Sequence, residues 1–287
     1  MLTQAQRTEF KRLGHLVVGG GIDRDLARRA GDAVEAAVPE PFDDRAATAR
    51  ATDREDLLGA VDATGAFESI NQRLFDYAEA LVGEGVLADP DGAEAAMDVA
   101  VGYPSHHGER DPGAPQVTDV DPRLPGYGDD PNAEPDYVAL TATVYLDRVL
   151  PQGGGLAVWS GSHWNVGEFF NTHALQAGRG GIWAIADETT HHVSFEPRSR
   201  RADQFDPFEV HGEPGTVVLA HGKLERAWAP NLTPCPRLSA TSSFAVEGAA
   251  AEREAGAAEI WRHWPAMEDV PGHYEEWFPD GVHRVEG

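Results

Sequence analysis

The chain has 287 residues, of which 48 are acidic and 23 are basic, so its formal net charge is −25. This length suffices for one large domain with a sizeable core or for two small ones. The excess of negative charge makes nucleic acid and anionic membranes poor partners, because binding them requires basic patches. The single cysteine excludes an intrachain disulfide and a cysteine metal cluster.

The acidic excess is accompanied by a near-absence of lysine. Lys11 and Lys223 are the only lysines, and every other basic residue is an arginine. This composition is typical of proteins from salt-accumulating halophiles, because molar salt shortens the Debye length to about 3 Å and screens repulsion between surface carboxylates. The alternative is an ordinary acidic protein that repels anionic partners.

No apolar run in the sequence approaches the roughly 20 residues that a membrane helix needs. The N-terminal segment MLTQAQRTEFKRLG lacks the apolar stretch of a secretory signal. From these two features we expect a cytoplasmic protein.

The N-terminal third predicts mainly helical structure. Thr3 followed by Gln6 is a capping-box pattern, in which each side chain accepts a hydrogen bond from the backbone N–H of the other residue at the start of a helix. Apolar residues then recur at helical spacing in three segments. The expected helices span residues 3–13, 23–37 and 66–82, with a short strand at residues 15–18.

The rest of the chain predicts strands joined by long connections. Residues 137–164 begin with an apolar, β-branched run that suits a strand buried on both faces. Pro151 and the glycines 153–155 predict a tight turn, after which residues 156–159 run back as the second strand of a hairpin. Further strands are expected at residues 97–103, 208–210, 216–220 and 238–246.

Helices followed by several strands indicate an α+β chain with a β-sandwich or jelly-roll core. The long polar connections at residues 104–136 and 165–205 are of the kind that is usually functional in a compact domain. Trp261, Trp264 and Trp277 in the tail predict that the tail packs on the body. The sequence contains no glycine-rich nucleotide loop and no Gly-x-Ser-x-Gly elbow.

Three segments resemble the phytanoyl-CoA dioxygenase family. They are Leu-Thr-x-x-Gln at residues 2–6, GGGLAVWSGSHW at residues 153–164, and GTVVLAHGKLERAWAPN at residues 215–231 followed by Arg237. The resemblance implies a double-stranded β-helix, which is a cupin-like jelly roll. It further implies Fe(II) and 2-oxoglutarate as cofactors and the activity of a dioxygenase, an oxidoreductase that hydroxylates its substrate.

The resemblance also implies one domain over residues 1–287. In this division residues 1–95 form a mainly helical N-terminal part packed on the core. Residues 96–246 form the jelly-roll core, and residues 247–287 form a C-terminal extension.

In the family a His-x-Asp pair and a distal histidine hold the iron, and an arginine grips the far carboxylate of 2-oxoglutarate through two parallel hydrogen bonds. The resemblance places Asp119 at the metal carboxylate and Arg237 at the co-substrate arginine. It places Val117 and Arg226 at the two histidine positions. Valine cannot ligate a metal and arginine is permanently protonated, so the metal triad is degenerate. A salt bridge between Arg226 and Asp119 is one way to fill such a site.

Other residues are candidates to replace the missing metal ligands. His107 and Glu109 have the spacing of a His-x-carboxylate pair, although they lie in a Pro/Gly-rich loop. His221 lies five residues before Arg226, an odd spacing that turns it to the other face of a regular strand. His163 is expected to anchor the turn after the glycines through hydrogen bonds.

The remaining candidates are expected to be incidental. His106, His191 and His192 are expected at the surface, and no role is predicted for His211. Cys235 lies between two prolines and is expected not to be a nucleophile.

Three functions follow from these features. The first is an oxygenase that uses Fe(II) and 2-oxoglutarate to hydroxylate a small or lipid-like substrate. The second is a catalytically inactive relative, a pseudoenzyme, that binds a carboxylate ligand in the jelly-roll pocket. The third is a purely structural protein. Arg237 supports the first two, whereas Val117 and Arg226 oppose the first.

Overall fold

The computed structural model describes residues 2–37, 65–88, 97–104, 138–164, 184–186, 193–195, 207–247 and 260–271. Its helices are α1 (Gln4–Leu13), α2 (Arg24–Ala37), α5 (Ala66–Val82) and the short 3-10 helix η3 (Pro265–Met267). Its strands are β1 (His15–Val18), β2 (Asp98–Gly102), β3 (Val138–Tyr145), β4 (Leu156–Val158), β5 (Ala184–Ala186), β6 (Val193–Phe195), β7 (Phe208–Glu209), β8 (Val217–His221), β9 (Arg226–Trp228) and β10 (Arg237–Ala245).

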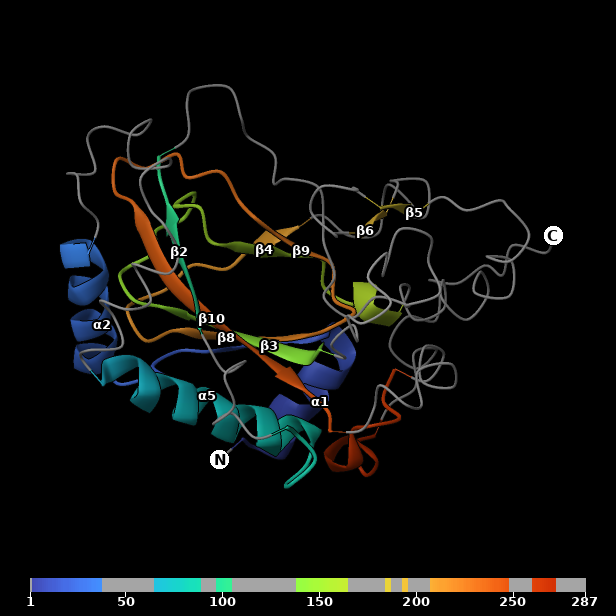
Figure 1. The fold of residues 1–287 in the computed structure, drawn as a ribbon. Coiled ribbons are helices and arrows are strands. Elements are labelled where there is room, and N and C mark those ends of the chain that lie inside the picture. Colours follow the sequence, from blue (N-terminus) through green and yellow to red (C-terminus); the bar gives the residue numbers. More distant parts are fainter. Residues whose placement is uncertain are drawn as a thin grey trace.

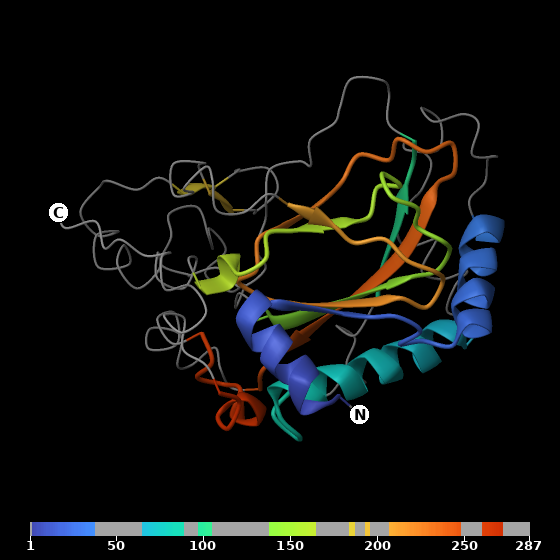
Figure 2. The same cartoon turned by 180° about the vertical axis from the view of Figure 1, so that it is seen from behind.

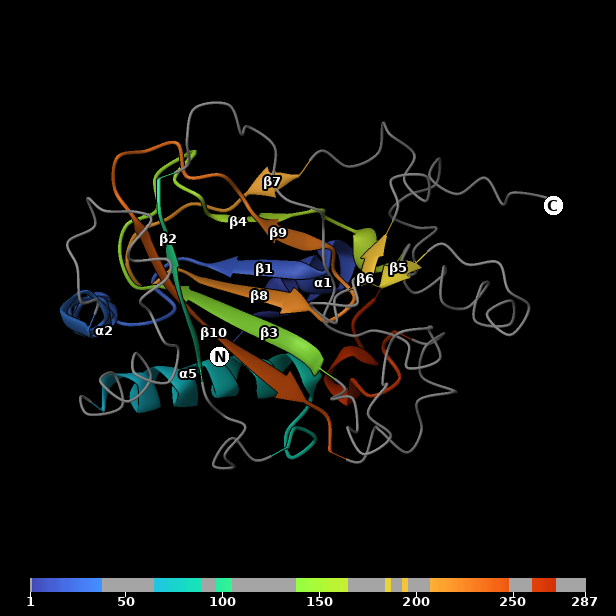
Figure 3. The same ribbon diagram turned by 45° about the horizontal axis from the view of Figure 1, so that its top comes forward.

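The strands form a jelly roll of two facing antiparallel sheets. The large sheet has the order β1-β8-β3-β10-β2, and the small sheet has the order β7-β4-β9. Among the described strands, β5 and β6 pair with each other in a separate two-stranded sheet. Helices α1 and α5 lie along one face of the large sheet, and the small sheet lies on its opposite face (Figures 1 and 2). Figure 3 shows the strands of both sheets side by side.

The main hydrophobic core fills the space between the helices and the large sheet. Along β3, the alternate residues Leu140, Ala142 and Val144 face the helices and are fully buried. Ile70 and Leu74 of α5 are buried in the same core. Because burial of a leucine or isoleucine side chain stabilises a protein by about 1.5–3 kcal/mol, this layer supplies much of the fold's stability.

A second, smaller core lies between the two sheets. Tyr145 and Val218 of the large sheet meet Leu156 and Val158 of the small sheet there. Successive residues of a strand point to opposite faces, so these positions identify which residues of each strand face the space between the sheets. We call this surface the inner face.

The helix ends have the predicted chemistry. The Gln6 backbone N–H donates to Thr3 Oγ1 at 3.2 Å, and the Thr3 N–H donates to Gln6 Oε1 at 2.9 Å, which completes the capping box. Gly14 ends α1 with a φ of 74°, a left-handed conformation that glycine adopts without strain. The Leu26 N–H donates to Asp23 Oδ1 at 2.9 Å at the start of α2. The three predicted helices are confirmed.

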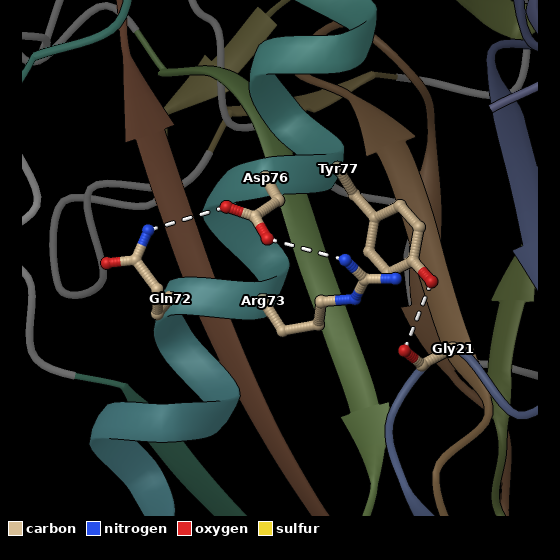
Figure 4. A network of polar contacts seen from close by, with 5 residues as sticks. All are labelled: Gly21, Gln72, Arg73, Asp76 and Tyr77. Carbon is tan, nitrogen blue, oxygen red and sulfur yellow. Dashed lines mark hydrogen bonds and ion pairs between the residues drawn. The ribbon is translucent and has the colours of Figure 1, made fainter. Parts of the chain in front are cut away.

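Helix α5 is attached to the loop after β1 by a small polar network (Figure 4). The buried Tyr77 hydroxyl donates to the carbonyl of Gly21 at 3.1 Å. Arg73 lies over the Tyr77 ring and forms an ion pair with Asp76 at 3.4 Å. Both partners of the ion pair are about half exposed, so it adds at most about 1 kcal/mol and the anchoring rests on Tyr77.

The predicted hairpin at residues 137–164 is wrong in its pairing. The turn forms, but β3 pairs with β8 and β10 in the large sheet whereas β4 pairs with β7 and β9 in the small sheet. The chain crosses between the sheets at this turn. The Leu156 N–H donates to the Tyr145 hydroxyl at 3.0 Å, and that hydroxyl donates to the Val210 carbonyl at 2.7 Å. A strand-turn-strand pattern does not specify partners, and in a jelly roll consecutive strands often belong to different sheets.

Several further predictions can be compared with the structure. The predicted strands at residues 97–103, 208–210, 216–220 and 238–246 are confirmed within one or two residues as β2, β7, β8 and β10. Strands β5, β6 and β9 were not predicted. Most of residues 104–136 and 165–205 lies outside the described residues. None of the helices in the described ranges is long and apolar enough to cross a membrane.

Candidate functional site

Arg237 lies at the start of β10 and points into the space between the sheets. Its side chain is 5% exposed. Its Nη1 donates to the carbonyl oxygen of Gly154, and its guanidinium carbon lies 3.5 Å from the centre of the Trp228 ring. Its buried Nε has no hydrogen-bond partner among the described residues. A buried N–H without an acceptor costs about 1–3 kcal/mol, so this edge of the guanidinium is suited to an incoming acceptor such as a carboxylate.

Gly102 provides the room that this guanidinium occupies. It pairs with Arg237 in register across β2 and β10. A Cβ atom at Gly102 would lie 2.8 Å from the guanidinium carbon, which is closer than real Cβ contacts come. Burial lowers the pKa of Arg237 to about 10, while the nearby Tyr145 hydroxyl acts in the opposite direction. The guanidinium therefore stays charged at neutral pH.

The turn that carries the Gly154 carbonyl is fixed by Glu209 of β7. One carboxylate oxygen of Glu209 accepts from the Gln152 N–H at 2.8 Å, and the other accepts from the Gly155 N–H at 2.9 Å. Gln152 has a φ of 62° and Gly154 a φ of 78°, so two residues of the turn are left-handed. Hydrogen bonds from these backbone N–H groups to the Glu209 carboxylate compensate for such strained backbone and hold the Gly154 carbonyl, which accepts from Arg237, in place.

Asn231 ties the same turn to β2. It forms a bridge with Gly153, and its Nδ2 donates to the Gly102 carbonyl at 3.0 Å and to the Cys235 carbonyl at 2.7 Å. Cys235 itself is exposed and free. Asn231 is thus a second support for the backbone around Arg237.

Arg226 in β9 also faces the space between the sheets. It lies opposite Val158 of β4, and directly opposed residues share a face of a sheet. Val158 belongs to the core between the sheets, so Arg226 points the same way, as does Trp228 two residues further along. Arg226 is half-buried. Its Nη1 is out of contact with solvent and has no hydrogen-bond partner within the described ranges. Burial lowers its pKa to about 10.

Hydroxyl groups line the middle of the inner face on the large sheet. Thr143 of β3 and Thr241 of β10 are opposite each other, and their Oγ1 atoms are 2.9 Å apart. Thr141 is buried and its Oγ1 has no partner in the described part of the chain. The Thr141 hydroxyl can donate and accept hydrogen bonds, whereas the residues of β3 that face the helices are apolar.

Several predicted site residues lie outside the described residues. They are Val117, Asp119, His107, Glu109, His106, His191 and His192. The proposed salt bridge between Arg226 and Asp119 therefore stays a prediction.

His221 has no ring nitrogen available for a metal. The Lys223 N–H donates to its Nδ1 at 3.0 Å, so the ring proton resides on Nε2, which donates to the Ile260 carbonyl at 3.1 Å. Its neighbour Ala220 faces the core between the sheets, so His221 faces the other way, as its spacing predicts. Burial lowers the pKa of His221 well below its ordinary value.

His163 anchors the chain after the turn, as predicted. Its Nε2 donates to the Lys11 carbonyl at 3.1 Å. The ring is fully buried against Gly14 and the rings of Trp261 and His221. Burial lowers the pKa of His163 to about 3, so the ring is neutral at physiological pH.

The tail segment 260–271 closes over these histidines. Trp264 is fully buried and stacks on His221 with ring centres 4.9 Å apart and an interplanar angle of 11°. The Lys11 ammonium donates to the carbonyls of Met267 at 3.0 Å and Val270 at 2.8 Å. The predicted packing of the tail on the body is confirmed for Trp261 and Trp264, and Trp277 lies outside the described residues. We call this contact region the tail seam.

The described residues do not fit an iron site by themselves. Among them, no group of three His, Cys, Asp or Glu side chains could hold a metal ion. Arg226, which the family resemblance aligns with the distal histidine, has a guanidinium that is a cation without a lone pair for a metal. His163 and His221 have their Nε2 atoms bonded to backbone carbonyls. The inner face described here is therefore suited to anions rather than to metal ions.

Sequence reasoning identified Arg237 and Arg226 but missed their supports. Trp228 could have been recognised, because it lies two residues after Arg226 and therefore shares its face on a strand. No sequence signal marks Gly102 or Glu209 as neighbours of Arg237, since both come close only through the pairing of distant strands.

Comparison with known proteins identifies the fold of the chain but no family. No family model and no curated protein sequence matches the chain. The epimerase SnoN in complex with Fe3+, alpha ketoglutarate and nogalamycin RO is similar in structure, with a TM-score of 0.52 and 16% identity over 85% of this chain and 83% of that chain. The non-heme alpha ketoglutarate dependent epimerase SnoN from nogalamycin biosynthesis gives a TM-score of 0.50 and 16% identity over 85% and 82%.

A third similar structure is EvdMO1, with a TM-score of 0.50 and 17% identity over 85% of this chain and 50% of that chain. At these identities the likeness concerns the fold. The chain therefore has the jelly-roll fold of the non-haem iron, 2-oxoglutarate-dependent enzymes, which confirms the predicted fold class.

Proposed function

We propose that this chain binds 2-oxoglutarate or a closely related carboxylate through Arg237, as a member of the 2-oxoglutarate-dependent jelly-roll class with an altered metal site. The observation that carries the proposal is the buried Arg237 guanidinium, which is held by Trp228 and the Gly154 carbonyl and leaves Nε without an acceptor among the described residues. SnoN, which shares the fold, binds alpha ketoglutarate in its complex.

The surroundings of Arg237 select for a carboxylate. A guanidinium presents its N–H groups in a rigid plane that matches the two oxygens of a carboxylate. The side chain is held before any ligand arrives, so little rotational entropy is lost on binding. In a chain of net charge −25, a buried cation without a described acidic partner is a specific point of attraction for an anion.

In this proposal each residue has one role in binding. Arg237 donates Nε–H to a carboxylate oxygen, and its bond to the Gly154 carbonyl fixes the orientation of the fork. Trp228 covers one face of the guanidinium and limits its contact with water. Gly102 supplies the space in which the side chain lies. No proton moves, because Arg237 stays charged and the ligand is ionised at neutral pH.

A second candidate function is the oxygenation of a small or lipid-like substrate, as in the phytanoyl-CoA dioxygenase family. The fold it shares with SnoN, whose complex holds both Fe3+ and alpha ketoglutarate, supports this candidate. It requires a metal site completed by Asp119 and by other residues outside the described ranges, with Arg226 displaced from the distal position. No step of such a reaction is derived from the residues described here.

Titration calorimetry in high salt tests the first proposal. 2-Oxoglutarate is titrated into the purified protein with a chelator present, and Arg237→Gln is compared with the exposed Arg148→Gln. We expect Arg237→Gln to weaken binding about 10- to 150-fold, because a charge-assisted pair is worth roughly 1.5–3 kcal/mol, and Arg148→Gln to leave binding unchanged. Absence of binding by the unaltered protein, or equal binding by both variants, would contradict the proposal.

Release of succinate from 2-oxoglutarate tests the second candidate. The protein is supplied with Fe(II), 2-oxoglutarate, O₂ and a reductant, and succinate is measured against a chelated control. Metal-dependent succinate formation would establish oxygenase chemistry. Binding of 2-oxoglutarate without succinate formation is the result that the altered metal site predicts.

A further inference from the structure

We propose that Arg226 binds the second carboxylate of the ligand, so that the inner face holds a small dicarboxylate at both ends without a metal ion. This inference rests on the proposed function and adds the class of ligand and its independence of metal. Arg237 would hold one end of the ligand and Arg226 the other.

The first support is that both arginines face the same space. Arg226 and Trp228 are two residues apart on β9, and both lie opposite inward-facing residues of β4. The Trp228 ring in turn lies against the guanidinium of Arg237, which comes from the opposite sheet. Alternate residues of a strand are separated by about 7 Å, so Arg226 lies about 7 Å along β9 from the residue whose ring covers Arg237.

The second support is that neither side chain has an acidic partner among the described residues. The exposed Arg24, Arg73 and Arg148 each form an ion pair with a carboxylate. Arg226 has a buried nitrogen without a partner among the described residues, and so does Arg237. Burying a cation without an anion is costly. A ligand with two carboxylates supplies an anion to both arginines, whereas a ligand with one carboxylate supplies it to only one of them.

The third support is the uncharged lining of the inner face around the two arginines' strands. The hydroxyls of Thr141, Thr143 and Thr241 lie on the inner face of the large sheet. They carry no charge that would require a charged group in the middle of a ligand. Trp228 and Phe208 present apolar surface on the inner face of the small sheet, with exposed fractions of 36% and 52%. Two cationic groups on an otherwise neutral face fit an aliphatic dicarboxylate.

The arrangement also explains how a jelly roll of this class can bind its ligand when an arginine replaces a metal-binding histidine. A guanidinium supplies positive charge where a metal ion would supply it, and it binds a carboxylate by two hydrogen bonds. A metal ion chelates the keto group together with the adjacent carboxylate, whereas an arginine needs only the carboxylate. The site should therefore accept glutarate as readily as 2-oxoglutarate.

Calorimetry with three ligands in the presence of a chelator tests this inference. The probes are 2-oxoglutarate, glutarate and the monocarboxylate butyrate. We expect the unaltered protein to bind the two dicarboxylates within about threefold of each other and at least about tenfold more tightly than butyrate. Arg226→Gln should weaken dicarboxylate binding to the level of butyrate and leave butyrate binding unchanged. Arg226→Lys, which keeps the charge without the planar fork, should have an intermediate effect.

The outcomes separate this inference from the proposed function. If the unaltered protein binds none of the three ligands, the proposed function fails. If it binds dicarboxylates and butyrate equally and only Arg237→Gln weakens binding, the proposed function stands and the role of Arg226 is refuted. A requirement for added metal, or a strong preference for 2-oxoglutarate over glutarate, refutes it as well. Should Arg226→Gln fail to fold, the ligand comparison on the unaltered protein still decides.

Discussion

The tail seam and the inner face lie on different sides of the strands and use polar side chains in opposite ways. In the tail seam, His163 and His221 are buried among tryptophans and donate to backbone carbonyls. On the inner face, Arg226 and Arg237 each keep a buried nitrogen without a partner among the described residues. The histidines of the tail seam serve packing, and arginines occupy the face for which ligand binding is proposed.

This difference shows that residue type alone does not identify a site. The tail seam also has buried nitrogens without a partner among the described residues, namely His163 Nδ1 and the Nε1 atoms of Trp261 and Trp264, but these groups are neutral. A buried cation without an acceptor destabilises the fold more, until an anion completes it. The two regions should therefore respond oppositely to mutation: the tail seam in stability, and the inner face in ligand binding.

The largest expected effect comes from a matched pair of tryptophan substitutions. Trp264→Ala removes a fully buried ring from the tail seam and should lower the free energy of unfolding by about 3–5 kcal/mol. Trp228→Ala removes a partly exposed ring from the inner face and should lower it by less than about half of that value. We expect Trp228→Ala to weaken 2-oxoglutarate binding about fivefold through loss of its contact with Arg237.

Chemical denaturation and calorimetry measure the two effects separately. If Trp228→Ala destabilises the fold as much as Trp264→Ala and leaves ligand binding intact, the division between the two regions is wrong.

A second expected difference between the two regions is that pH changes the stability of the fold through the buried histidines but does not change ligand binding at the inner face. Burial lowers the pKa of His15 to about 4 and that of His163 to about 3, from an ordinary value of 6.5. Below pH 6.5 the unfolded chain binds protons that the folded chain does not, so stability falls as the pH decreases toward the folded-state pKa. For His163 the expected decrease in the free energy of unfolding between neutral pH and pH 5 is about 2 kcal/mol.

Denaturation at pH 7 and pH 5 measures this effect on the unaltered protein, on His163→Gln and on the exposed His211→Gln. The difference between the free energies of unfolding at pH 7 and at pH 5 should shrink in His163→Gln and stay unchanged in His211→Gln. Ligand binding between pH 6 and 8 should not change, because burial leaves the pKa of Arg226 and of Arg237 at about 10. A stability difference that persists undiminished in His163→Gln would contradict the burial argument.

The smallest expected effect concerns the support of Arg237. Gly102→Ala places a Cβ atom 2.8 Å from the guanidinium carbon and forces the side chain to move. Because the end of an arginine is flexible, we expect little loss of stability and a weakening of 2-oxoglutarate binding by about five- to tenfold, which corresponds to roughly 1 kcal/mol or slightly more. Binding equal to that of the unaltered protein in calorimetry would show that the position of the guanidinium is not important.

The sequence predicted local structure well because local chemistry determines it. The capping box at Thr3, the turn at the glycines 153–155 and the burial of β3 on both faces all form as expected. The composition predicted adaptation to high salt, which no structural comparison tests. Both lysines are buried, so the positively charged side chains at the surface are arginines.

The pairing of strands could not be predicted in the same way. The turn after β3 looked like a hairpin, but β4 finds its partners 50 to 70 residues further along the chain, in β7 and β9. The contacts that build the candidate site depend on such distant pairing. Gly102 meets Arg237, and Glu209 holds the turn at Gly154, only because the sheets bring them together.

Binding of Mn(II), a redox-stable substitute for Fe(II), tests the central claim most directly. The central claim is that the inner face is an anion site in which Arg226 stands where a metal ligand would be. Mn(II) is titrated into the protein in high salt and followed by electron paramagnetic resonance, with and without 2-oxoglutarate. The account predicts no saturable binding in the micromolar range, together with 2-oxoglutarate binding that is unchanged by chelator. Micromolar Mn(II) affinity that 2-oxoglutarate strengthens would contradict it.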